Sequence, residues 1–71
     1  MNTILSERRS SDAHIEQLIE KIKSRPESVD KVRRGGSLML IKSAGFTLYE
    51  AQWIYRAVTQ GMTKNEFDEL L

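Results

Sequence analysis

Apolar side chains recur at helical spacing in two stretches of the chain. In the first stretch, isoleucine and leucine stand at i, i+3, i+4 and i+7, the pattern of an amphipathic helix: Ile15, Leu18, Ile19 and Ile22. Asp12 suits a helix start, and Pro26 pushes the residue before it out of the helical region. The pattern predicts a helix from about Asp12 to Ser24.

The second stretch, Thr47–Gln60, opens with the S/T-x-x-E spacing of a capping box, formed by Thr47 and Glu50, and Gly61 comes directly after it. We therefore expect a well-capped helix with two distinct faces. One face is apolar and is expected to lie in the core: Leu48, Ala51, Ile54, Tyr55 and Val58. The opposite face carries aromatic and polar side chains and is the less easily explained one: Tyr49, Trp53, Arg56 and Gln60.

Shorter elements are expected between and after these stretches. Pro26 suits the first turn of a helix that includes Glu27–Arg34, and Gly35-Gly36 is expected to separate that helix from the next apolar segment. The alternative is a continuous helix with a close contact at the glycines. That segment, Leu38–Ser43, is too short and too apolar for periodicity to decide its type, so a helix is favoured on context. Its alternative is a strand, Leu38–Lys42, that pairs across a dimer. Past Gly61, Thr63 and Glu66 repeat the capping-box spacing and predict a last short helix.

These elements predict an all-α fold, a compact bundle of four to five short helices with a helix-turn-helix-like arrangement around Leu38–Gln60. Residues 1–10 are expected to form a flexible arm and residues 11–71 a single helical domain. A chain of 71 residues with no cysteine buries little surface and has no disulfide to stabilise it, so a homodimer is expected.

Composition adds little about partners. The net charge is +1, with nine Lys and Arg against six Asp and Glu up to Lys42, and two against four afterwards. The longest purely apolar run, Leu38–Ile41, is far shorter than the roughly 20 residues of a membrane span. With no visible targeting segment and no cysteine, the expected location is cytoplasmic and no membrane association is expected.

Catalysis is not expected from this sequence. His14 is the only histidine, and the absence of cysteine removes the usual pairs of nucleophile and base. We expect no catalytic residue, no metal site, no cofactor and no small-molecule substrate. The protein is therefore expected to act by binding, with DNA or a partner protein as the partner.

For DNA, the segment around Gly45 is spaced like the packing positions of a helix-turn-helix: Leu40, Ala44, Gly45, Phe46, Ala51 and Ile54. Ile41 departs from this pattern, because a small residue is usual there. On this interpretation Thr47–Gln60 is the recognition helix, and the residues towards the groove are Thr47, Tyr49, Gln52, Trp53 and Arg56. Phosphate contacts would come from four cations: Lys31, Arg33, Arg34 and Lys42. A seven-residue segment, 61–67, also loosely resembles the inter-helix turn of ribbon-helix-helix repressors.

For a protein partner, the same helix offers the residue types most enriched among interface hot spots, on the face with Tyr49, Trp53, Arg56 and Gln60. The acidic end around Glu66 suits this alternative better than DNA. A third interpretation is plain packing, in which Trp53 belongs to the core, because tryptophan is highly buried on average. The leading expectation is a DNA-binding, transcription-regulating module, with a protein-binding adaptor or inhibitor close behind.

Overall fold

A computed structural model describes residues 11–71 and confirms an all-α fold. Its helices are α1 (Asp12–Lys23), α2 (Pro26–Ala44), α3 (Leu48–Gln60) and α4 (Lys64–Leu70). The expected arm, residues 1–10, lies outside the described residues. Within residues 11–71, no helix is both long and apolar enough to cross a lipid bilayer.

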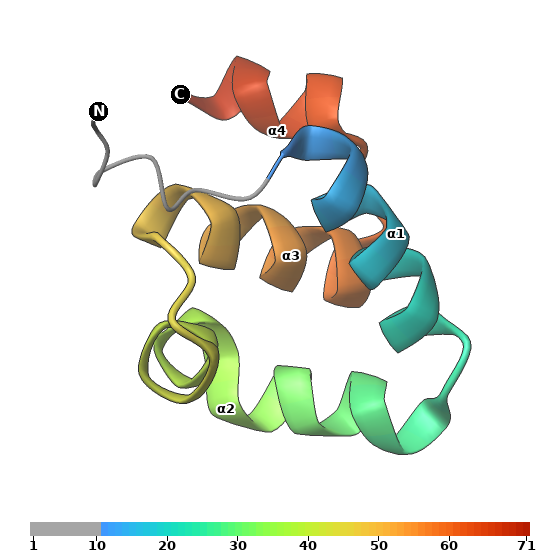
Figure 1. The fold of residues 1–71 in the computed structure, drawn as a ribbon. Coiled ribbons are helices and arrows are strands. Elements are labelled where there is room, and N and C mark those ends of the chain that lie inside the picture. The colour runs from blue at the N-terminus through green and yellow to red at the C-terminus, as the bar shows by residue number, and fades with distance from the viewer. Residues whose placement is uncertain (1–10) are drawn as a thin grey trace.

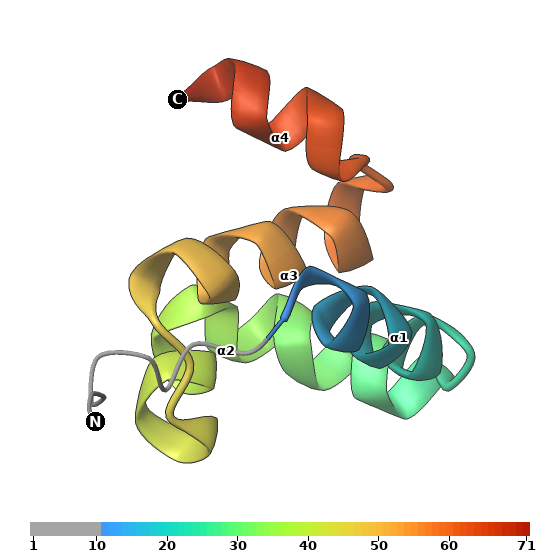
Figure 2. The same cartoon turned by 45° about the horizontal axis from the view of Figure 1, so that its top comes forward.

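The helix α3 occupies the middle of the molecule (Figures 1 and 2). It packs against α1 and α2 on one side and against α4 on the other, and no other described helix packs against all of the rest. Six of its thirteen residues are buried: Glu50, Ala51, Trp53, Ile54, Ala57 and Val58. The rest of the core comes from Ile15 and Ile19 of α1, Val32 and Leu40 of α2 and Phe67 of α4.

Local sequence explains where the helices begin and end. Ser11 caps α1 by accepting a hydrogen bond from the His14 amide at 3.2 Å, and Pro26 occupies the first turn of α2. Gly45 and Gly61 end α2 and α3 in the left-handed conformation, at φ 76° and 69°. These glycines let the chain reverse within three residues on either side of α3.

The double glycine bends α2 where a break was expected, but helix follows directly on both sides of the bend. Gly36 has φ 69° and ψ −171°, which is non-helical, while the residues on both sides are helical. Figure 1 shows the second part, 37–44, turned steeply away from the first. The segment Leu38–Lys42 is therefore helical, and the alternative of an intermolecular strand is not adopted.

One core prediction was wrong. Leu48, assigned by its spacing to the apolar face of α3, is 61 % exposed. It is the first residue of α3, where the chain has only just left the turn at Gly45, so the neighbouring helices do not yet cover it. Leu38 of α2 is similarly exposed at 60 %.

Replacement of Gly36 tests the bend. Because its torsion angles are almost confined to glycine, Gly36→Ala is expected to lower the free energy of unfolding by about 1–3 kcal/mol. Urea denaturation followed by circular dichroism measures this change. Ser43→Ala, at an exposed helical position of α2, is the control and should stay within about 0.5 kcal/mol of the parent. Equal stability of the two variants would contradict a requirement for the bend.

Candidate functional site

The helix α3 is held at both ends, which makes it a firm platform for a binding surface. Thr47 Oγ1 accepts a hydrogen bond from the Glu50 amide at 3.2 Å, and Glu50 Oε1 accepts one from the Thr47 amide at 3.0 Å. The capping box predicted from the sequence is thus formed, and it accounts for the burial of the Glu50 carboxylate at 3 % exposure. At the other end, the Gly61 amide donates to the Ala57 carbonyl at 3.0 Å.

The first half of the α3 face expected to be accessible, with Tyr49 and Trp53, lies against α4. Trp53 is only 2 % exposed, so of the interpretations that the sequence left open for this residue, the packing interpretation holds. The ring of Tyr49 lies 6.3 Å from that of Trp53 and 5.4 Å from that of Phe67, centroid to centroid. Phe67 is itself buried, so α4 joins the core through this aromatic cluster.

Polar contacts fasten α4 at the edge of the same cluster. The Tyr49 hydroxyl donates to Asp68 Oδ1 at 2.6 Å, and Lys64 Nζ donates to Asp68 Oδ2 at 2.7 Å. Lys64 Nζ also lies 3.6 Å from Asp12 Oδ2 of α1 and 5.7 Å from the centre of the Trp53 ring. These contacts connect α1, α3 and α4 above the tryptophan.

The same contacts shift the titration of the three groups. Hydrogen bonds from Lys64, and then from Tyr49, hold the pKa of Asp68 below its usual value. The hydrogen bond to Asp68 raises the pKa of Tyr49, with burial as the next cause. The pKa of Lys64 is raised as well, first by its bond to Asp68. All three directions favour the charged Lys64–Asp68 pair with a neutral tyrosine beside it.

With both flanks covered, one side of α3 stays open to solvent. We name this surface the α3 strip; its residues are exposed or half-buried and lie at helical spacing: Leu48, Gln52, Tyr55, Arg56 and Thr59. Of the predicted binding residues, the structure places Gln52 and Arg56 on this strip, with the exposed Gln60 at its end. Tyr49 is half-buried at its margin, and Trp53 is absent from it.

The sequence did not predict that Leu48, Tyr55 and Thr59 belong to the open surface of α3. A signal was present in Phe67, because an aromatic residue in a short amphipathic helix needs an apolar partner, and the aromatic side of α3, where Tyr49 meets it, offers one. Once α4 is placed on the Trp53 side of α3, the side of α3 that carries Gln52 is left open to solvent.

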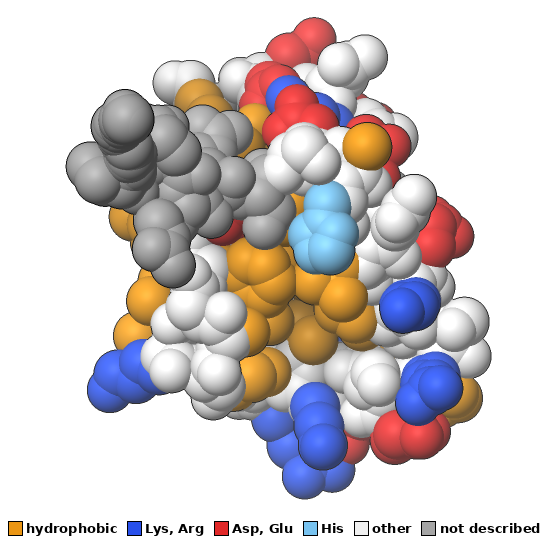
Figure 3. Space-filling view, in the orientation of Figure 1, with side chains coloured by type: hydrophobic (Ala, Val, Ile, Leu, Met, Phe, Trp, Pro, Cys, Tyr) orange, Lys and Arg blue, Asp and Glu red, His pale blue; other side chains and the backbone are white. Residues whose placement is uncertain are grey.

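The predicted phosphate contacts all lie exposed on α2: Lys31, Arg33, Arg34 and Lys42. Arg34 forms an ion pair with Asp30, and the other three make no salt bridge within residues 11–71. Along the chain, segment 21–42 carries seven Lys and Arg against two Asp and Glu. Figure 3 shows one face of the molecule, with most of the Lys and Arg side chains in its lower half and several carboxylates at the top, over α4.

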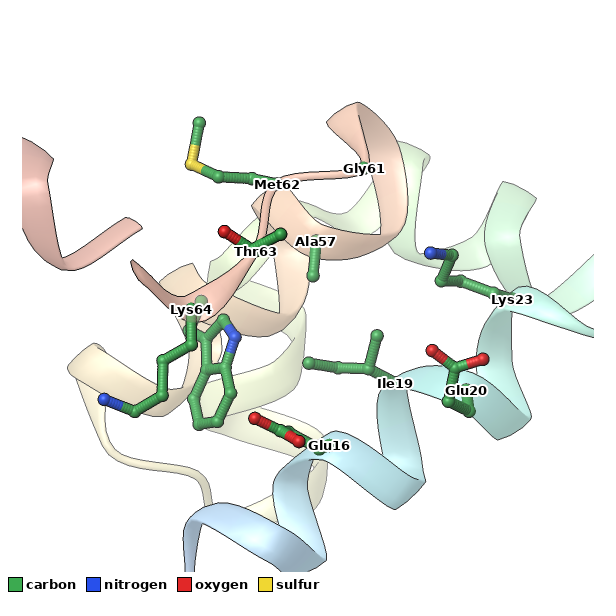
Figure 4. Close-up of a pocket in the computed structure, with 10 residues that line it drawn as sticks. Glu16, Ile19, Glu20, Lys23, Ala57, Gly61, Met62, Thr63 and Lys64 are labelled. Carbon is green, nitrogen blue, oxygen red and sulfur yellow. The ribbon is translucent and has the colours of Figure 1, made fainter. Parts of the chain in front are cut away.

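A hollow of about 290 Å³ opens where α1 faces the end of α3 and the start of α4 (Figure 4). Its lining includes the apolar side chains of Ile19, Ala57 and Met62, together with Trp53. Charged residues of both signs complete the lining: Glu16, Glu20, Lys23 and Lys64. Within residues 11–71, no three His, Cys, Asp or Glu side chains stand close enough to hold a metal ion.

Comparison of the chain with protein-family models, with curated proteins and with solved structures finds no significant match. Its function is therefore argued from the geometry and the charge of the described residues.

The Asp68 contacts give a pH-dependent stability. Because folding lowers the pKa of Asp68, its contribution to stability is fully present above the unfolded pKa of about 3.8 and is lost as the pH falls from there through the lower folded pKa. Asp68→Asn is therefore expected to melt below the parent at pH 6, with a gap that closes towards pH 2.5. Thermal melts by circular dichroism at several pH values measure this gap.

Glu69→Gln provides the matched control, because Glu69 is exposed and makes no salt bridge in the described part of the chain. Its melting temperature should follow that of the parent at every pH. A gap for Asp68→Asn that is the same at pH 6 and pH 2.5 would contradict the assigned role of the carboxylate.

Proposed function

We propose that this protein is a small, non-catalytic regulatory module that binds a partner protein through the α3 strip. The observation that carries the proposal is the exposure of Leu48, at 61 %, on a helix whose other sides are packed against its own neighbours. Tyr55 and Arg56 come next along the strip, and these two residue types are enriched among interface hot spots.

The construction of α3 supports recognition by a preformed surface. Capping at both ends and packing on two flanks fix the backbone before a partner arrives, so little conformational entropy remains to be lost on binding. The strip contains no carboxylate, since the one acidic residue of α3, Glu50, is buried in the capping box. Gln52 and Thr59 provide polar groups beside the apolar and aromatic ones.

Photo-crosslinking tests this proposal. A benzophenone amino acid at Gln52 is expected to give a discrete crosslinked product in cells, read by immunoblot and identified by mass spectrometry. The same label at Glu27, exposed on α2, is the positional control and should give none. Adding Leu48→Asp should reduce the Gln52 product at least fivefold, because it places a charge in an apolar contact.

The mass of the product also identifies the kind of partner. A product of twice the chain mass indicates a second copy, in agreement with the expected homodimer, whereas another mass indicates a different protein. Equal labelling from Gln52 and Glu27, or a product insensitive to Leu48→Asp, would refute binding through the α3 strip.

DNA binding of helix-turn-helix type is the second candidate. Two observations favour it: Gly45 adopts the left-handed turn between 37–44 and α3, and the motif positions Leu40, Ala51 and Ile54 are buried. The exposed cations of α2 would then supply phosphate contacts. It ranks second because α4 covers the Tyr49 and Trp53 side of α3, where the motif faces the groove, and brings carboxylates such as Asp68 with it.

A gel shift on random duplex DNA tests the second candidate. If DNA is the partner, the protein retards the duplex at low salt, and its affinity falls steeply as the salt concentration rises. Binding of Lys and Arg side chains releases counterions from the phosphates, and that release becomes less favourable in high salt. Arg33→Ala with Arg34→Ala should weaken binding several-fold, whereas Glu16→Gln with Glu20→Gln should not weaken it. Absence of any retardation at low salt would eliminate DNA as the partner.

A further inference from the structure

The hollow between α1 and the α3–α4 turn contains an unsatisfied hydrogen-bond donor. Trp53 lines this hollow and is 2 % exposed, and its indole N–H meets no acceptor within residues 11–71. Buried tryptophan N–H groups usually have a partner, because leaving a buried donor unpaired is unfavourable. A molecule in the hollow is placed to supply an acceptor for this N–H.

The carboxylates of the hollow indicate the charge of that molecule. Glu16 and Glu20 stand one turn apart on α1, border the hollow, and form no salt bridge in the described part of the chain. Lys64, by contrast, is already paired with Asp68 and lies near Asp12. Lys23 borders the hollow as well and makes no salt bridge within residues 11–71, so the two carboxylates exceed the one unpaired cation and favour a single cationic group beside α1.

The remaining lining favours a ligand with both carbonyl and apolar groups. Lys23 borders the hollow and can donate a hydrogen bond, while Ile19, Ala57 and Met62 offer an apolar surface. In Figure 4, Glu16, Ile19 and Glu20 of α1 stand on one side and Met62, Thr63 and Lys64 on the other. A peptide combines all of these groups, because backbone carbonyls alternate with side chains of different character.

We propose that this hollow is a docking site for a peptide segment of a partner protein in which a lysine or arginine adjoins an apolar residue. A backbone carbonyl accepts the Trp53 N–H, the basic side chain lies between Glu16 and Glu20, and the apolar side chain packs on Ile19 and Met62. The site is formed by the opposite flank of α3 from Leu48 and Tyr55, so it is separate from the α3 strip and does not depend on it.

The single tryptophan makes the test direct, because a ¹⁵N-labelled chain gives one indole resonance. The probe is acetyl-Leu-Lys-N-methylamide, titrated into the full chain while ¹H–¹⁵N correlation spectra are recorded. We expect a saturable downfield shift of the Trp53 indole proton, together with shifts of the Ile19 and Met62 amides. Acetyl-Leu-Glu-N-methylamide is the control probe and should bind at least fivefold more weakly.

Two variants separate charge recognition from a general effect. Glu16→Gln with Glu20→Gln should weaken binding of the lysine probe about fivefold, the sum expected for two exposed ion pairs. Glu27→Gln with Glu69→Gln changes the net charge equally at exposed carboxylates outside the hollow and should leave the affinity unchanged. Dispersed amide spectra establish that each variant is folded.

Three results would overturn the proposal. The first is a Trp53 indole resonance that does not shift at millimolar concentrations of the lysine probe, or whose proton shows exchange with water and no effect of the probe. The second is equal affinity for the lysine and glutamate probes. The third is a set of shifts confined to Gln52 and Tyr55, which would assign peptide binding to the α3 strip instead.

Discussion

The structure depends on the burial of one helix from two sides. In a chain of 71 residues without cysteine, apolar packing has to supply most of the stability, and α3 contributes six of the buried residues. Trp53 and Ala57 extend that burial beyond the face that α1 and α2 cover. The largest apolar side chain of the protein is thereby removed from water, and α4 has a surface on which to fold.

This arrangement also sets the polar contacts and the open surface. Because α4 lies on the aromatic side of α3, its carboxylates come close to Tyr49 and Lys64, and the Asp68 contacts can form. Because α1 and α2 lie on the other side, the α3 strip is left uncovered by the described helices. The position of the α3 strip is thus set by where α1, α2 and α4 pack on α3, and not by the sequence of α3 alone.

Much of the local structure could be predicted from the sequence. The ends of α1 and α3, the two capping boxes and the break near Gly36 depend on neighbouring residues, so reading along the chain finds them. The accessible face of α3 could not be found in that way. Both of its flanks carry apolar residues at helical spacing, and only the way the other helices pack on α3 decides that Trp53 is buried while Leu48 is exposed.

The charges show the same contrast between local and spatial information. A count along the chain gives a net charge of +1 and only a weak asymmetry between its two parts. In three dimensions the cations collect along α2 and the carboxylates over α4, because these helices lie on opposite sides of α3 (Figures 2 and 3). The protein therefore presents different charges to partners on its two sides.

The bend at Gly36 has a mechanical consequence for both candidate surfaces. Segment 37–44 leads through the turn at Gly45 directly into α3, so the torsion angles of Gly36 determine how α3 is oriented relative to the first part of α2. The α3 strip is carried by that helix, and the hollow is bounded by the same helix and α1. A small rotation at Gly36 would therefore reorient α3 and alter the α3 strip and the hollow together.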